Sequence, residues 1–277
     1  MISWTIRCCR AFAPGNGLKL RPKDSFAWIL QSTGKMVRTS HRKPEGLEIL
    51  YEDNHLLVVV KPPGILSQED ASGDPDVLSI LKRYIKESRN KPRNVFVGLV
   101  HRLDRATGGI MVLALTSKAA ARLSEDFQKS RVTKKYIAVV NRSLDETLAI
   151  LPGKSGELSD RYRKDERSRM AVACEADHPD AKEARLLFSV LGDLSGSKHT
   201  ALEVELLTGR FHQIRYQLAS RGLPLAGEAK YADQGLADFR LGLWSYRLEI
   251  RHPVGQRELK VFEKLPSSRW WRDILQG

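Results

Sequence analysis

The pattern of apolar and polar residues changes near residue 47, where the chain first takes on strand character. The run LLVVV (56–60) is rich in β-branched residues, and Pro62, Pro63 and Gly64 follow it closely. A run of this kind closed by proline and glycine is typical of a strand that enters a turn. We therefore expect the folded core to begin here.

Four later segments also have strand signatures, and two of them alternate cleanly between apolar and polar positions. Leu202, Val204 and Leu206 are apolar, and the residues between them are glutamates. Such alternation is typical of an antiparallel strand with one face in contact with water. The four segments are 108–116, 135–140, 201–208 and 246–253, and the last repeats the alternation at Tyr246, Leu248 and Ile250.

Two segments place apolar residues at helical spacing, VLSILKRYI (77–85) and the segment around AARLSEDFQ, where Ala119, Leu123 and Phe127 lie one turn apart. Strands outnumber helices and do not alternate with them regularly. This favours an α+β fold, with a mixed, mainly antiparallel central sheet and flanking helices, over a doubly wound sheet. Residues 153–183 are rich in Gly, Ser, Asp, Arg and Lys and are predicted to form a long mobile insertion.

The first 45 residues differ from the rest of the chain. They are basic and weakly patterned, and Asp24 and Glu45 are their only acidic residues. We expect residues 1–45 to be a poorly ordered basic extension and residues 46–277 to form the main folded domain. The extension has three open interpretations: a targeting arm, an RNA-contacting arm, or sequence upstream of a true start at Met36.

The overall charge indicates a polyanionic partner. Lys and Arg number 46 against 33 Asp and Glu, a formal net charge of +13 over 277 residues. Nucleic acid fits this excess best, and a membrane surface is the competing interpretation. No apolar run approaches the roughly 18–20 residues that span a bilayer. Cys8, Cys9 and Cys174 form no CxxC pair, so no disulfide framework or zinc site is implied and a reducing, cytoplasmic location is expected.

Two motifs contain residues that could carry chemistry. In HRLDRATGGIMVLALT (101–116), Asp104 lies between arginines directly before a predicted strand; a solvated turn is one interpretation and a reactive carboxylate another. Gly108 and Gly109 fit a tight turn there. In TGRFHQIRYQL, a helix is predicted from QIRYQLAS, so Arg210, His212 and Arg215 lie near its N-terminal end, where a phosphate or carboxylate is favoured.

Taken together, five motifs resemble the successive signatures of RluA-type RNA pseudouridine synthases, in order, from about residue 47 to residue 266. They are the two above and YEDNHLLVVVKPPG, KKYIAVV and YRLEIRHPVG. The resemblance implies the pseudouridine synthase catalytic fold and isomerisation of specific uridines in RNA without cofactor or metal. In that reaction the C1′–N1 bond breaks, the uracil turns, and a C1′–C5 bond forms. Ribosomal RNA and transfer RNA are both open as substrates, and a monomer is expected.

The resemblance also implies roles for individual residues. Asp104 matches the catalytic aspartate, Tyr136 the active-site tyrosine, and Arg215 the arginine that pairs with the aspartate. A guanidinium favours the ionised form of a carboxylate, and its planar fork can hold one through two parallel hydrogen bonds. Arg102 matches the residue that fills the gap left by the displaced nucleotide. The residues expected to contact RNA are Arg102, Arg105, Lys134, Lys135, Arg210 and His212.

Some features depart from the family pattern or allow another interpretation. Phe211 stands where the family more often has Thr or Ser, and residues 1–45 are too few for the small S4-type domain that often precedes the catalytic domain. Trp270 and Trp271 are interpreted as packing residues. The alternative function is a catalytically inactive RNA-binding protein on a synthase-like fold. Asp104 argues against it, because a pure phosphate binder gains nothing from a carboxylate in its basic cleft.

Overall fold

The computed structural model describes residues 28–30, 36–38, 44–90, 92, 94–175, 177–194, 198–232, 240–268 and 271. The chain divides into two units, 1–40 and 41–277. In the first unit, β1 (Trp28–Leu30) and β2 (Met36–Arg38) form an antiparallel pair. The prediction of poor order over 1–45 falls mostly outside the described residues.

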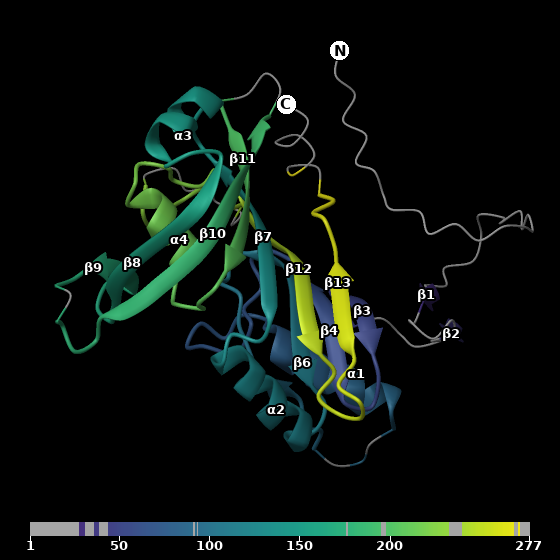
Figure 1. Ribbon diagram of the computed structural model, residues 1–277. Helices are drawn as coiled ribbons and strands as arrows, with labels where there is room; N and C mark the ends of the chain where they lie inside the picture. The colour runs from purple at the N-terminus through teal and green to yellow at the C-terminus, as the bar shows by residue number, and fades with distance from the viewer. Residues whose placement is uncertain are drawn as a thin grey trace, which may run out of the picture. The chain divides into compact units, whose positions relative to one another are not determined.

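The described part of the second unit is built on one eleven-stranded sheet (Figure 1). Among the described strands of this sheet, only β6 and β12 pair in parallel, and the other strand pairs are antiparallel. The predicted mixed, mainly antiparallel sheet is therefore confirmed. The strand order is β3 (Glu48–Glu52), β4 (Leu56–Lys61), β6 (Gly108–Ala114), β12 (Leu243–Arg251), β7 (Thr133–Val140), β11 (Thr200–Leu206), β10 (Lys182–Asp193), β8 (Ser155–Asp165) and β9 (Met170–Ala173), with β13 (Leu259–Glu263) beside β12 and β5 (Gly98–Leu99) beside β6.

Two of the three predicted helices are present as α1 (Val77–Ser88) and α2 (Ser117–Gln128). Each begins at a residue whose side chain accepts a hydrogen bond from a backbone N–H of the first turn, Asp76 in α1 and Thr116 in α2. Two short helices, α3 (Leu144–Ile150) and α4 (Gln213–Ala219), complete the described set, and α4 confirms the helix predicted at QIRYQLAS. No helix among the described residues is long and apolar enough to cross a membrane.

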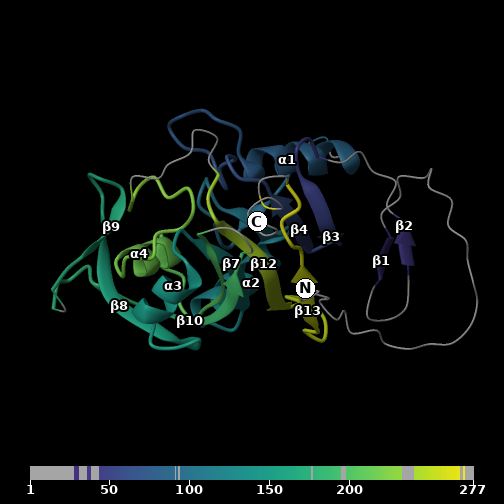
Figure 2. The same ribbon diagram turned by 90° about the horizontal axis from the view of Figure 1, so that it is seen from above.

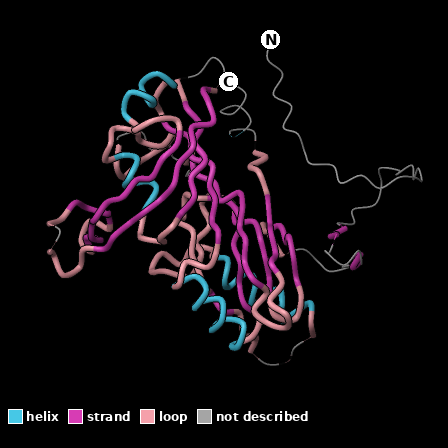
Figure 3. The backbone as a smooth tube through the Cα atoms, viewed as in Figure 1, coloured by secondary structure: helices cyan, strands magenta, loops and turns pink. Residues whose placement is uncertain are grey.

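The helices α1 and α2 cover opposite faces of the sheet at β4 and β6 (Figures 2 and 3). Leu57 and Val59 of β4 share a buried cluster with the apolar face of α1. Leu56 and Val58 share another with Ala119 and Leu123 of α2. Burial on both faces explains why β4 reads as a continuous apolar run rather than an alternating one.

The prediction of a mobile insertion over 153–183 is wrong. Apart from residue 176, which is not described, this segment forms β8, a turn, β9 and the start of β10. Only Leu158 and Tyr162 of β8 are buried apolar residues, and the positions between them are polar. The strand therefore lacks the apolar alternation by which a strand is recognised in sequence.

A contact between two tryptophan rings tests the interpretation of the tryptophans near the C-terminus. Trp271 is buried and its ring lies edge-on to that of Trp244, with 6.2 Å between ring centroids. Its predicted packing role is confirmed, whereas Trp270 lies outside the described residues.

The sheet is tightest where β6 and β12 meet. Gly109 lies opposite Ser245 at a φ of +120°, and a Cβ there would stand 2.2 Å from the Ser245 carbonyl oxygen. A Cβ at Gly108 would stand 2.4 Å from the Trp244 ring. The glycine pair therefore permits close contact between two strands, beyond the tight turn that the sequence predicts. This contact sets the spacing between β6 and β7, which flank β12 and lead to the cleft described below.

We expect Gly109→Ala to reduce the free energy of unfolding by at least ~3 kcal/mol, because it adds a backbone clash to an unfavourable φ. Gly73→Ala is the matched control. Gly73 also has a positive φ, +72°, but an added Cβ would meet nothing within 4 Å. It should therefore cost only about 1–2 kcal/mol. Urea unfolding monitored by circular dichroism measures both values, and equal losses would contradict the close-approach argument.

Candidate active site

A cleft of about 690 Å³ opens beside the sheet where β6, β7 and α4 come together. The loop before β6 forms one wall, β7 forms the floor, and the turn that leads into α4 forms the opposite wall. Ser124 and Gln128 of α2 also line the cleft. The three residues predicted to be catalytic, Asp104, Tyr136 and Arg215, all line this cleft.

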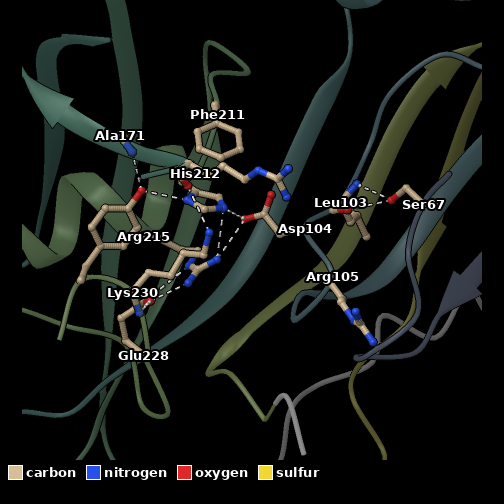
Figure 4. A network of polar contacts seen from close by, with 12 residues as sticks. Ser67, Leu103, Asp104, Arg105, Ala171, Phe211, His212, Arg215, Glu228 and Lys230 are labelled. Carbon is tan, nitrogen blue, oxygen red and sulfur yellow. Dashed lines mark hydrogen bonds and ion pairs between the residues drawn. The ribbon is translucent and has the colours of Figure 1, made fainter. Parts of the chain in front are cut away.

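The loop that carries Asp104 is fixed from behind by Ser67. The buried Ser67 hydroxyl donates to the Leu103 carbonyl (2.7 Å) and accepts from the Leu103 N–H (3.1 Å). The Thr107 N–H then donates to the Asp104 carbonyl (3.0 Å), which closes a turn before β6. The two hydrogen bonds between Ser67 and Leu103 hold the backbone next to Asp104 and so restrict the position of the Asp104 carboxylate. This carboxylate faces His212 and Arg215 (Figure 4).

Arg215 approaches Asp104 but gives its bidentate contact to another residue. Its Nη1 lies 3.7 Å from Asp104 Oδ2. Its Nε and Nη2 donate to the two carboxylate oxygens of Glu228 at 2.9 and 2.5 Å, and Glu228 is fully buried. The predicted ion pair is therefore present, whereas the predicted fork between Arg215 and Asp104 is wrong, because Glu228 occupies it. Sequence patterning gave no signal for this buried glutamate.

Burial leaves the Asp104 carboxyl harder to ionise than an ordinary aspartate. Burial raises the pKa of Asp104, and the negative charge of Glu228 raises it further. The positive charges of Arg215 and Lys61 oppose this rise without cancelling it, so the pKa of Asp104 lies above its usual value. Because Arg215 is shared with Glu228, it stabilises the Asp104 carboxylate less than the sequence predicts.

Lys61 is a second residue near the site that sequence patterning missed. It ends β4, is fully buried, and donates to the carbonyls of Pro62 (3.0 Å), Ile65 (2.7 Å) and Arg105 (3.1 Å). The ammonium thus connects the turn after β4 to the residue that follows Asp104. Burial lowers the pKa of Lys61 to about 7.

His212 links the carboxylate to a tyrosine and to the β8–β9 hairpin. Its Nε2 lies 3.8 Å from Asp104 Oδ2, and its Nδ1 lies 2.8 Å from the Tyr231 hydroxyl. That hydroxyl accepts the Ala171 N–H of β9 at 2.8 Å. Burial and the charge of Arg215 lower the pKa of His212 to about 3, so the ring is neutral at physiological pH. Tyr231 was not predicted as a site residue.

Tyr136 forms the floor of the cleft from β7 and is buried. Burial and the charge of Asp104 raise the pKa of its phenol, so the hydroxyl stays protonated. His101 supports the structure around the cleft: its Nε2 accepts the Val112 N–H at 3.0 Å and its ring stacks on Phe127. Among the described residues, no group of three or more His, Cys, Asp and Glu side chains is placed to hold a metal ion.

The structure separates the residues predicted to contact RNA into two groups. Arg102, Lys134, Arg210 and His212 line the cleft. Arg105 instead forms an ion pair with Asp74 (2.7 Å) and donates to the Gly64 carbonyl (3.0 Å).

Lys135 lies on the other face of β7, beside Glu203 (2.9 Å) and Glu205 (3.7 Å). The structure therefore does not bring Arg105 or Lys135 to the cleft.

Comparisons with known proteins agree with this geometry. The family model described as RNA pseudouridylate synthase matches residues 55–220. The chain is 31% identical to ribosomal large subunit pseudouridine synthase D of Pseudomonas aeruginosa, over 92% of this chain and 81% of that protein. The protein of the same name from Yersinia pestis is 33% identical, over 79% of this chain and 67% of that protein.

Among solved structures, human RNA pseudouridylate synthase domain containing 4 matches with a TM-score of 0.61 and 24% identity. The match covers 82% of this chain and 92% of that chain, and it shows that the two share a fold. The resemblance found in the sequence motifs is therefore confirmed, and the chain belongs to the RNA pseudouridylate synthase family of enzymes.

Proposed function

We propose that this protein isomerises specific uridines of large-subunit ribosomal RNA to pseudouridine, with Asp104 as the reacting carboxylate. The observation that carries the proposal is a single restrained carboxylate that shares a basic cleft with Tyr136 and Arg215. Ribosomal RNA is favoured over transfer RNA because the similar curated proteins are named for the large ribosomal subunit.

The reaction conserves atoms and needs little besides a positioned anion. The C1′–N1 bond breaks, the freed uracil turns, C5 bonds to C1′, and the hydrogen on C5 leaves as a proton while N1 gains one. An ionised carboxylate can act on C1′ as a nucleophile or as a counter-charge. We assign this role to Asp104, and to Tyr136 the role of packing against the uracil while it turns.

The target base must leave its stack before it can reach Asp104, which costs a few kcal/mol. Arg102, Lys134 and Arg210 line the cleft and offer positive charge to the RNA backbone. We assign Arg102, which lies two residues before Asp104, to the space that the displaced nucleotide leaves. Phosphate contacts of this kind fix the position of the strand without reading its sequence.

The proposal is tested by incubating the purified protein with large-subunit ribosomal RNA that carries tritium at C5 of uridine. Formation of the C1′–C5 bond releases the label to water, so release measures the reaction directly. Carbodiimide labelling followed by primer extension then locates the modified position. RNA that binds without any release would support the inactive RNA-binding alternative.

We expect Asp104→Asn to reduce the single-turnover rate to below about 1% of wild type, because the amide keeps the shape of the side chain but cannot carry the negative charge. RNA affinity should remain within a few-fold, since the carboxylate does not contribute to phosphate binding. Tritium release at saturating enzyme and a filter-binding titration measure the two quantities. Substantial residual turnover would remove Asp104 from its assigned role.

The raised pKa of Asp104 predicts how the rate depends on pH. The ionised form reacts, so the rate should fall as pH drops through the Asp104 pKa, at a pH above the ordinary aspartate value of 3.8. Glu228→Gln removes a negative charge that raises this pKa, so the acid limb of the profile should move to lower pH.

Glu228→Asp is the matched control, because it alters the contact with Arg215 but keeps the charge, and its acid limb should move less. Single-turnover rates across pH, on variants whose fold is verified by circular dichroism, measure the three profiles. An unmoved limb in Glu228→Gln would show that Glu228 does not act on Asp104 through its charge.

A further inference from the structure

We propose that Lys134 and Arg210 together bind one phosphate group of the RNA strand, in a subsite beside the uridine held at Asp104. The inference rests on the proposed function, because it takes a polyanionic strand in the cleft as its premise. It adds a defined anion site, made of two side chains from separate elements, to the general positive charge of the cleft.

Lys134 has an unusual environment for a lysine. The residue is only 8% exposed and lines the cleft. Within the described part of the chain, no hydrogen bond or ion pair to its ammonium is recorded, and the charged group that acts on it most is Arg210. Burial and the charge of Arg210 both lower the pKa of Lys134.

Lys135, its neighbour in sequence, shows the usual arrangement. It lies on the opposite face of β7 beside Glu203 and Glu205, and these charges raise its pKa. A buried cation without a partner destabilises a fold, and a second cation beside it adds to the cost. The buried Lys134 ammonium and the exposed Arg210 guanidinium both line the cleft, and an anion that binds between them stabilises both charges.

Hydrogen bonds fix the position of Arg210 in the turn before α4. It is exposed in the turn before α4, and its Nε donates to the Glu183 carbonyl at 2.8 Å. Its backbone N–H and the Thr208 hydroxyl both donate to the side-chain oxygen of Gln213, at 3.0 and 2.9 Å. These hydrogen bonds restrict the turn. Among the described residues, the two terminal guanidinium nitrogens of Arg210 make no hydrogen bond or ion pair.

The turn also passes close to the Lys134 ammonium. A Cβ built on Gly209 would lie 3.6 Å from Lys134 Nζ, so the backbone between Thr208 and Arg210 runs directly beside this charge. An anion at this point can contact the ammonium and the guanidinium together. A phosphodiester, with two unesterified oxygens, suits a pair of donors from two directions.

The position of the subsite indicates which phosphate it binds. Lys134 and Tyr136 lie on the same face of β7, two residues and thus about 7 Å apart. Tyr136 is assigned to the target uracil, so the phosphate belongs to a nucleotide next to the target. Ser124 and Gln128 of α2 also line the cleft, which therefore extends beyond the residues assigned to the target uridine.

The test compares Lys134→Met with Lys135→Met, two adjacent substitutions that remove the same charge from opposite faces of one strand. The affinity of each for a large-subunit ribosomal RNA fragment is measured from low to high salt. A lost phosphate contact should reduce the slope of log K against log salt by about 0.7–0.9 in Lys134→Met. The slope of Lys135→Met should equal that of wild type, and Lys134→Arg should restore it. Equal slopes in both Met variants would overturn the proposal.

A second arm tests the location of the contact. Single methylphosphonate linkages, which are neutral, are placed one at a time around the modified uridine. Wild type should lose affinity at one linkage next to the target, and Lys134→Met should show no further loss there, because the contact is already absent. A uniform response at all linkages, or a loss in Lys134→Met as large as in wild type, would overturn the proposal.

These readouts separate the subsite from the proposed function. The salt arm measures binding, so it can support the subsite even if no ribosomal RNA fragment is isomerised. Conversely, isomerisation with an unchanged salt slope in Lys134→Met would keep the function and remove the subsite. A rate loss in Lys134→Met at saturating enzyme, with unchanged affinity, would assign Lys134 to the reaction itself and also contradict the proposal.

Discussion

The buried ion pair between Arg215 and Glu228 is the interaction on which the rest of the site depends. Burying two charges is costly, and the pair is tolerated only because two parallel hydrogen bonds satisfy both groups. It joins α4 to the segment after it and fixes the guanidinium beside Asp104. Burial raises the pKa of Asp104, and because Arg215 is shared between two carboxylates it offsets only part of that rise. One contact thus sets both the geometry and the electrostatics of the reacting group.

The sheet brings the segments that carry Asp104 and Tyr136 together, although they are distant in sequence. Asp104 precedes β6, Tyr136 lies on β7, and β12 separates the two strands. Their spacing depends on Gly109, which lets β12 approach without a clash. Backbone packing therefore sets the width of the cleft, and side-chain hydrogen bonds from Ser67 fix the carboxylate within it.

Charge pairing distinguishes the basic residues that hold the fold together from those that can bind a ligand. Arg105 and Lys135 contact carboxylates of the protein itself and contribute to its structure. Lys134 and Arg210 converge on the cleft, and no carboxylate contact to either is recorded among the described residues. A net charge of +13 indicates a polyanionic partner, and this division shows which basic side chains of the cleft are not paired with a carboxylate of the protein among the described residues.

The sequence by itself determined the main strands, two of the flanking helices and the family, because apolar periodicity and motif order are local properties of the chain. It also named Asp104, Tyr136 and Arg215, which the fold brings to one cleft. The β8–β9 hairpin was missed because its buried positions are too few to produce a strand pattern. Only the tertiary structure decided that Glu228 holds the fork of Arg215, that Lys61 supports the loop of Asp104, and which of two adjacent lysines faces the cleft. These outcomes depend on which segments become neighbours in space, and hydrogen bonds between residues far apart in sequence leave no periodic signal in the chain.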